Sequence, residues 1–94
     1  MITAFVLLEV DVDRVGEVAA AIARVDEAVE VYSVTGRYDL IVKVKVARNE
    51  DLAEVVTAAI GRVGGIRRSE TVIAFRSYAD EVLDAGFAYG QDAD

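Results

Sequence analysis

The sequence predicts a small α+β domain whose elements follow the order β-α-β-β-α-β. Three observations support this prediction. Apolar runs typical of strands stand near both ends of the chain and in its middle. Between them lie two stretches whose apolar residues recur every three or four positions, as on one face of a helix. Two glycine-containing runs, residues 34–39 and 65–71, separate these elements and carry most of the polar side chains of interest.

The first strand is expected at residues 2–10, an almost continuous apolar run. Alternate positions of a strand point to opposite faces, so Phe5 and Leu7 lie opposite the other apolar residues of this run. A strand that is apolar on both faces is typical of one buried on both. We therefore expect this strand to be buried on both faces.

Two helices are expected, one over residues 13–25 and one that follows residue 49 and ends at residue 63. Asp11 and Asp13 are start signals for the first helix. Asn49 is the expected N-cap of the second, and Gly64 with Gly65 ends it. The apolar stripes are Val15, Val18, Ile22 and Val25 in the first helix, and Leu52, Val55, Val56, Ala59, Ile60 and Val63 in the second.

Residues 28–35 and 39–47 are rich in β-branched residues and predict a β-hairpin, with Gly36 at a positive φ in its loop. The last strand is expected at residues 71–78, and residues 77–83 favour a short helix. We divide the chain into a folded domain at 1–78 and a C-terminal part, short helix and polar tail, at 79–94.

This order of elements is that of a ferredoxin-like fold, a four-stranded antiparallel sheet with both helices on one face. The opposite face would then expose Phe5, Leu7, Tyr32 and Ile41. Hydrophobic residues make up 54% of the chain, more than so small a domain can bury. We therefore expect a dimer that forms through the open sheet face.

Composition narrows the function classes. The 94 residues include no histidine and no cysteine, which excludes serine-histidine and thiolate mechanisms and nearly every zinc or copper site. We expect no catalytic residue, no metal and no cofactor. The net charge of −7 disfavours direct nucleic-acid binding, a conclusion that a basic patch of Arg62, Arg67 and Arg68 weakens without reversing.

The expected location is the cytoplasm. The sequence shows neither a basic, cleavable leader nor a run of about 20 apolar residues, so we expect no export and no membrane contact.

The polar run at 34–39 has two interpretations. It is an ordinary hairpin loop, or it is a loop that holds a small ligand. In the second case Asp39 would pair with an ammonium group, and Arg37 or exposed backbone amides would pair with a carboxylate. Those are the two charges of an amino acid. Ser69, Glu70 and Thr71 are either a solvated strand start or the second wall of the same pocket.

These residues resemble the ligand-binding domain, or RAM domain, of the Lrp/AsnC transcription regulators. Residues 34–39, Val-Thr-Gly-Arg-Tyr-Asp, are similar to the hairpin motif of that family. Residues 65–71 are similar to its glycine-led entry into the last strand. The resemblance covers roughly residues 2–78. Regulators of this family begin with a helix-turn-helix domain, which this sequence lacks, so it resembles a stand-alone form.

The resemblance implies dimers that pair through their sheets and assemble into higher oligomers, with amino acids bound in clefts between dimers. The implied ligand-binding residues are Thr35, Gly36, Arg37, Tyr38, Asp39, Ser69 and Thr71. Arg37 occupies a variable place in the motif and is expected to tune specificity. A full-length Lrp/AsnC regulator is a further expected partner.

The sequence thus predicts a non-enzymatic domain that binds a small ligand, an amino acid, and modulates assembly or a transcription regulator. Two alternatives stay open. One is a dimeric α+β barrel enzyme, monooxygenase-like, in which Tyr32 or Glu30 would have to act. The other is a purely structural assembly module.

Overall fold

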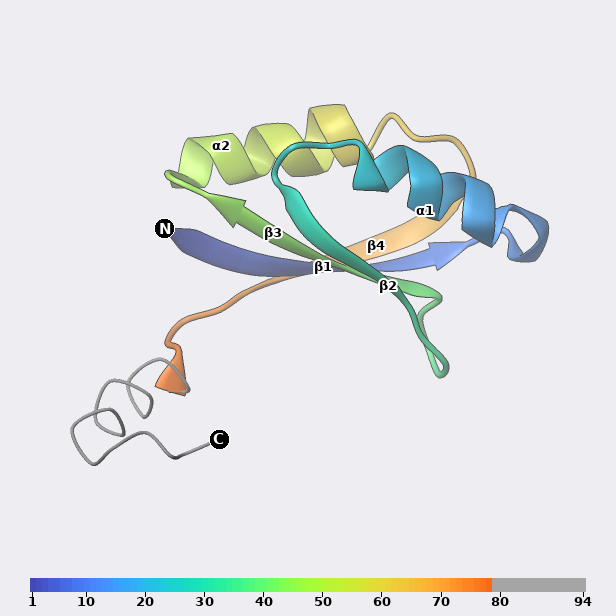
Figure 1. The fold of residues 1–94 in the computed structure, drawn as a ribbon, viewed down its shortest axis with the longest axis horizontal. Coiled ribbons are helices and arrows are strands. Elements are labelled where there is room, and N and C mark those ends of the chain that lie inside the picture. The colour runs from blue at the N-terminus through green and yellow to red at the C-terminus, as the bar shows by residue number, and fades with distance from the viewer. Residues whose placement is uncertain (79–94) are drawn as a thin grey trace, which may run out of the picture.

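The computed structural model describes residues 1–78 and contains one sheet of four antiparallel strands in the order β2-β3-β1-β4 (Figure 1). The predicted order of elements and the predicted fold are confirmed. The elements are β1 (Ile2–Val10), the 3-10 turn η1 (Val12–Arg14), α1 (Val15–Ala23), β2 (Ala28–Ser33), β3 (Leu40–Val46), α2 (Asn49–Glu54), its π-helical continuation η2 (Val55–Ile60) and β4 (Ile66–Ile73).

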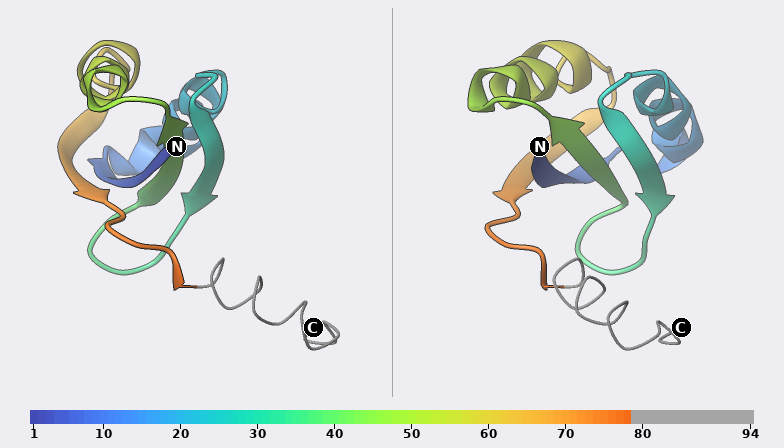
Figure 2. Two further views of the ribbon diagram at one scale, coloured as in Figure 1. Left: turned by 90° about the vertical axis from the view of Figure 1, so that its left-hand side faces the viewer. Right: turned by 60° about the vertical axis from the view of Figure 1, so that its left-hand side comes forward.

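Both helices lie on one face of the sheet, as the two side views show (Figure 2). The core between the two layers is made of aliphatic side chains. Alternation along β1 and β3 sends every second residue toward the helices, where the two helical stripes meet them. The fully or nearly fully buried residues are Ala4, Val6, Leu8, Val10, Val18, Ile22, Leu40, Val42, Val44, Val46, Leu52, Val55 and Ile60.

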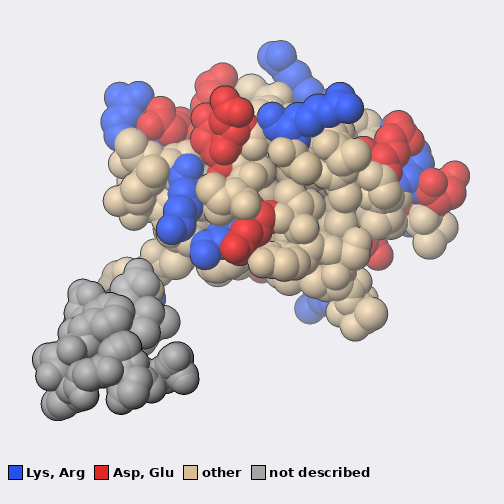
Figure 3. Space-filling model, viewed as in Figure 1, with Lys and Arg blue, Asp and Glu red and all other residues tan. Residues whose placement is uncertain are grey.

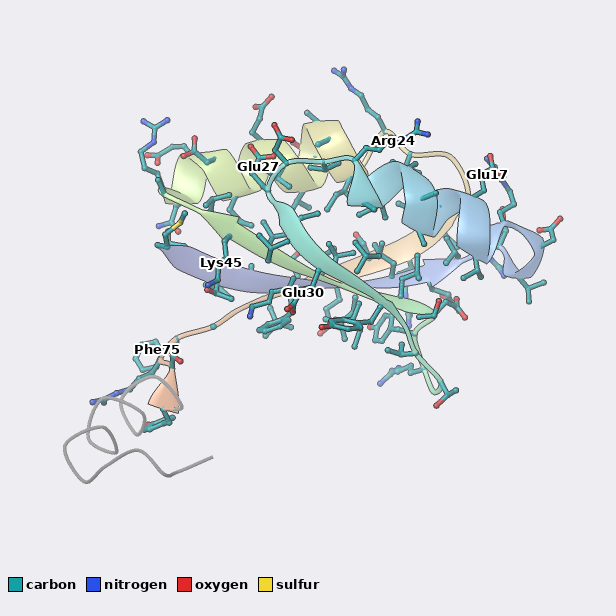
Figure 4. All side chains as sticks on the ribbon, viewed as in Figure 1. Glu17, Arg24, Glu27, Glu30, Lys45 and Phe75 are labelled. Atoms are coloured by element: carbon teal, nitrogen blue, oxygen red, sulfur yellow. The ribbon has the colours of Figure 1, made fainter. Side chains whose placement is uncertain are left out.

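The other face of the sheet carries a mixed surface. Phe5 and Leu7 of β1 are half-buried there, next to Ile41 of β3, and Tyr32 of β2 is 52% exposed. In the single chain, β1 is therefore fully buried only on the side of the helices. The expectation that both of its faces are buried is wrong for the single chain. The side chain of Glu30 also lies on this side (Figure 4). This sheet surface opposite the helices is called the open face below.

A cavity of about 650 Å³ lies on the open face near the N-terminus. Phe5 lines it together with Lys43 and Lys45 of β3 and residues 74–77, which follow β4. Elsewhere, basic and acidic side chains are interspersed over the face seen in Figure 3. No helix among residues 1–78 is both long and apolar enough to cross a bilayer.

The second helix begins one residue earlier than predicted, so the prediction of Asn49 as its N-cap is wrong. Arg48 holds the cap position in an extended conformation, and its carbonyl accepts hydrogen bonds from the amides of Asp51 (3.1 Å) and Leu52 (3.2 Å). No side chain caps this end. The Arg48 guanidinium instead pairs with the Asp51 carboxylate at 2.9 Å and lowers the pKa of that carboxyl through hydrogen bonding.

The last strand is also shifted from its prediction, since β4 spans Ile66–Ile73 and not 71–78. Gly65 has φ +95°, which lets the chain turn into the strand at once, and its carbonyl accepts a hydrogen bond from the Asp11 amide (2.9 Å). β4 then pairs with β1 along most of its length. The helix expected over 77–83 runs past the last described residue, and the division at residue 78 stays a prediction.

Candidate functional site

The two polar runs that the sequence singles out meet in space. The loop between β2 and β3 projects away from the helix layer, toward the open face (Figure 1). The first half of β4 lies beside its tip. Together they form a pocket of about 300 Å³, which is lined by Arg37, Tyr38, Arg68, Ser69 and Glu70. Four of these five residues are exposed, so the pocket is shallow and faces solvent in the single chain.

Tyr38 and Glu70 join the two walls of the pocket. The Tyr38 hydroxyl donates a hydrogen bond to Oε1 of Glu70, a residue 32 positions further along the chain. This hydrogen bond, with some loss of solvation, raises the pKa of the Tyr38 phenol. Tyr38 therefore keeps its proton at neutral pH and acts as a donor. The position of the loop relative to β4 is set in part by this contact.

Arg68 lies against the other side of Tyr38. Its guanidinium carbon is 5.8 Å from the centre of the Tyr38 ring, within the range of a cation–π contact. Its Nε is 3.7 Å from Oε1 of Glu9 on the neighbouring strand β1. Both partners of that ion pair are about half exposed, so the pair adds little to stability. Arg68 is thereby held over the pocket and not folded away from it.

Asp39 has a structural role in the loop. Its Oδ2 accepts a hydrogen bond of 2.8 Å from the Val10 amide, at the irregularity in β1 where the pairing with β4 shifts. Its own amide donates to the Leu8 carbonyl (2.8 Å), and its carbonyl accepts from the Val34 amide (3.0 Å). Asp39 thus ties both ends of the loop to the end of β1. Its predicted pairing with a ligand ammonium group stays a prediction.

Gly36 has φ +117°, as predicted for the loop. This region favours glycine, because a Cβ would crowd the backbone there. A built Cβ meets no atom within 4 Å, so the requirement is conformational and not one of space. Gly36 shapes the loop tip, while Thr35 before it is exposed and does not line the pocket.

Of the seven predicted ligand-binding residues, three line the pocket: Arg37, Tyr38 and Ser69. The other four, Thr35, Gly36, Asp39 and Thr71, lie next to it or shape it without lining it. Thr71 pairs with Val6 of β1, one pleat beyond Glu70, so its side chain belongs to the other face of β4. Whether any of the seven binds a ligand stays a prediction.

Arg68 is the lining residue that sequence reasoning missed as a site residue. The sequence places it only in a basic patch, because the last strand is expected there to begin at residue 71. A strand that begins directly after Gly65 puts Arg68 and Glu70 on one face and Ser69 on the other. The sequence signal that could have located the start of this strand is Gly65. A glycine at positive φ can end a helix, and a strand can then begin at the next residue.

The residues at this site do not form a metal centre. Among residues 1–78 no group of three or more acidic side chains is arranged to hold an ion, and the sequence has neither histidine nor cysteine. The pocket is lined by charged groups of both signs and by hydroxyl groups, and its volume suits a small ligand.

Comparison with known proteins shows the same domain elsewhere. The family model for the Lrp/AsnC ligand binding domain matches residues 3–83. The HTH-type transcriptional regulator FL11 of Pyrococcus horikoshii is 34% identical over 77 residues, which is 82% of this chain and 50% of the regulator. The chain thus spans about half the length of the curated relatives it matches.

Solved structures agree with this result. The crystal structure of TTHA0845 from Thermus thermophilus is 47% identical, with a TM-score of 0.80 over 83% of this chain and 98% of that one. A transcriptional regulator from Neisseria meningitidis, solved as a complex with L-Met, shares the fold at 14% identity and a TM-score of 0.74, over 81% of this chain and 51% of that one. The chain belongs to the Lrp/AsnC family, whose ligand-binding domain model it matches over residues 3–83.

Proposed function

We propose that this domain binds a small ligand, an amino acid, in the pocket between the β2–β3 loop and β4. The single observation that carries the proposal is that pocket itself. Two segments far apart in the sequence meet there and present cationic, anionic and hydroxyl groups together. A zwitterion needs a cation for its carboxylate and an anion for its ammonium group, and both are within the pocket.

The Neisseria meningitidis regulator supports this ligand class, because it shares the fold and was solved with L-Met. We further propose that the complete site lies at a cleft between subunits. The pocket is shallow in one chain, and the loop that forms it stands at the rim of the open face, where a second copy would approach. A partner surface would then supply the missing walls.

The output of binding is proposed to be a change of assembly, in this chain alone or together with a full-length Lrp/AsnC regulator. Ligand at a subunit cleft favours the assembly in which the cleft is complete, and by linkage that assembly binds the ligand more tightly. The curated relatives are named as transcriptional regulators, which supports a regulatory role. We propose that this role is exercised in the cytoplasm. With a net charge of −7, we propose no direct contact between this domain and nucleic acid.

The direct test is calorimetric titration with each standard amino acid, in parallel with sedimentation velocity of the same samples. We expect heat of binding for at least one amino acid and a shift in sedimentation at the same ligand concentration. Absence of both for every amino acid would refute the proposed function.

Dimerisation through the open face has its own test. Ile41 lies at the centre of that face, paired with Leu7 on one side and Tyr32 on the other. Ile41→Glu would bury a carboxylate in the interface, so we expect the protein to sediment as a monomer at micromolar concentration. Val12→Glu is the matched control, since Val12 is 88% exposed on η1, away from this face, and should leave assembly unchanged. An Ile41→Glu protein that still dimerises would place the interface elsewhere.

We propose a role without catalysis. Among residues 1–78 no polar or charged side chain is buried, so the sheet–helix interface holds no acid or base. Tyr32 and Glu30, the residues that a barrel-type enzyme would have to use, lie on the open face. Glu30 raises the pKa of the Tyr32 phenol, chiefly through a hydrogen bond. That shift moves Tyr32 away from the neutral pKa that suits acid–base catalysis.

A further inference from the structure

The charges that line the pocket are unbalanced in a way that points to a narrower ligand class. Arg37 and Arg68 bring two guanidinium groups, and Glu70 brings one carboxylate. This excess of positive charge stands out in a chain whose net charge is −7. Tyr38 and Ser69 complete the lining with hydroxyl groups. A pocket of this kind is matched by a ligand with two negative groups and one positive group.

Glu70 can still accept from a ligand while it holds Tyr38. Tyr38 donates to one oxygen, Oε1, and a carboxylate has several acceptor positions on its two oxygens. The phenol stays neutral and therefore does not neutralise Glu70. An ammonium group of the ligand can therefore pair with the carboxylate of Glu70.

Arg68 is likewise only partly engaged. Its Nε lies 3.7 Å from the Glu9 carboxylate, longer than a hydrogen bond, and both side chains are substantially exposed. A guanidinium offers several N–H donors in a rigid fork, more than this one contact uses. The cation–π contact with Tyr38 restrains the position of the group, which lowers the entropic cost of binding a carboxylate.

Arg37 stands on the opposite wall, at the exposed tip of the loop beside Gly36. The backbone of this tip is held by the hydrogen bonds of Asp39 at its base, so the loop presents Arg37 from a defined position. The two guanidinium groups therefore come from separate elements and can contact separate groups of one ligand.

We propose that the pocket selects acidic amino acids over neutral and basic ones. The α-carboxylate and the side-chain carboxylate each pair with one guanidinium, and the α-ammonium pairs with Glu70. A neutral amino acid leaves one guanidinium without a counter-charge, and a basic one adds a third cation beside Arg37 and Arg68. This inference rests on the proposed function, because it assumes that the ligand is an amino acid bound here.

The test is calorimetric titration of the intact chain at fixed ionic strength with glutamate, aspartate, glutamine, asparagine and lysine. A hydrogen-bonded charge pair predicts that glutamate binds roughly tenfold or more tightly than glutamine. One of the two variants Arg37→Gln and Arg68→Gln, the one that loses the partner of the side-chain carboxylate, should bring that ratio close to one. The other loses the partner of the α-carboxylate and should weaken the binding of glutamate and of glutamine alike. Glu70→Gln should lower the affinity for glutamate. It should leave the affinity for glutarate, which lacks the ammonium group, at or above its original value.

Arg67→Gln is the matched control. It removes the same charge one residue away, but Arg67 does not line the pocket and its Nε lies 3.8 Å from the Asp11 carboxylate. We expect it to keep the preference for glutamate. Circular dichroism of all variants confirms that the fold is intact.

The outcomes separate the two proposals. If glutamine or another neutral amino acid binds as tightly as glutamate, the charge selection is refuted while amino-acid binding stands. If Arg67→Gln loses the preference as fully as the more affected of the two pocket variants, or if neither pocket variant loses it, the selection does not arise from the pocket charges, and the inference is refuted. If no amino acid binds, the proposed function itself fails, and this inference fails with it.

Discussion

Replacing Asp39 tests the structural role of the loop most directly. Asp39→Ala removes the acceptor of the Val10 amide, which lies 2.8 Å from Oδ2 at a partly buried place beside the end of β1. The amide would lose a partner that carries a full negative charge. Hydrogen bonds to charged groups contribute about 1.5–3 kcal/mol, and an amide left without a partner costs a similar amount. We expect Asp39→Ala to lower the free energy of unfolding by about 2 kcal/mol.

For a domain of this size, about 2 kcal/mol corresponds to a fall in Tm of roughly 8–16 °C. Urea unfolding followed by circular dichroism measures the change, at one fixed protein concentration because association adds to stability. Asp39→Asn is the matched control, since it keeps an oxygen acceptor of the same shape without the charge and should lose about half as much. A loss below about 0.5 kcal/mol for Asp39→Ala, typical of an ordinary surface position, would refute this account of the loop.

Two further predictions concern stability. Gly65→Ala should destabilise the domain by about 1–2 kcal/mol in urea unfolding, because Gly65 has φ +95° and a Cβ would lie 3.1 Å from Cγ2 of Val18. Gly16→Ala is the matched control, since Gly16 lies in a helix with open space around it, and it should stabilise the domain by roughly 0.5–1 kcal/mol. The hydrogen bond from Arg14 lowers the pKa of Glu17 below its ordinary 4.5, so this pair stabilises the fold above that pH and the stabilisation is lost as the pH falls. Glu17→Gln should therefore flatten the fall in Tm below about pH 4.5, and an unchanged acid profile would contradict the pairing.

The fold could be predicted because the local spacing of apolar residues indicates its main helices and strands. One face of β1 is buried, and the two helical stripes bury Val18, Ile22, Leu52, Val55 and Ile60, while other stripe residues pack half-buried against this core. Gly36 adopts the positive φ that the hairpin needs. The start of β4 could not be predicted, for a physical reason. It is an edge strand, held by backbone pairing to β1, and its first half is polar. Such a strand needs little apolar burial, so hydrophobic alternation does not mark where it begins.

The site could be predicted in outline and not in detail. One of the two interpretations of the sequence places the loop and residues 69–71 on the walls of one pocket. Arg37, Tyr38, Ser69 and Glu70 do line a common pocket, while ligand binding there stays a prediction. The division of roles is not visible in the sequence, because it depends on register. Pairing of Glu70 with Leu7 puts Glu70 on the open face beside Tyr38, while Thr71 turns to the other side. Asp39 has the chemistry of a ligand-binding residue, yet the nearby end of β1 supplies an amide that its carboxylate binds.

This division of roles decides which variant can tell a ligand sensor from a structural module. Asp39→Ala changes the loop backbone, so it would weaken binding and stability together and would not separate the two interpretations. Arg37 lies at the exposed loop tip, and Arg37→Gln should change the free energy of unfolding by no more than about 0.5 kcal/mol. If ligand-linked assembly is lost in Arg37→Gln while stability is kept, the pocket acts as a sensor. If assembly follows stability across both variants and ignores the pocket charge, the domain serves assembly alone.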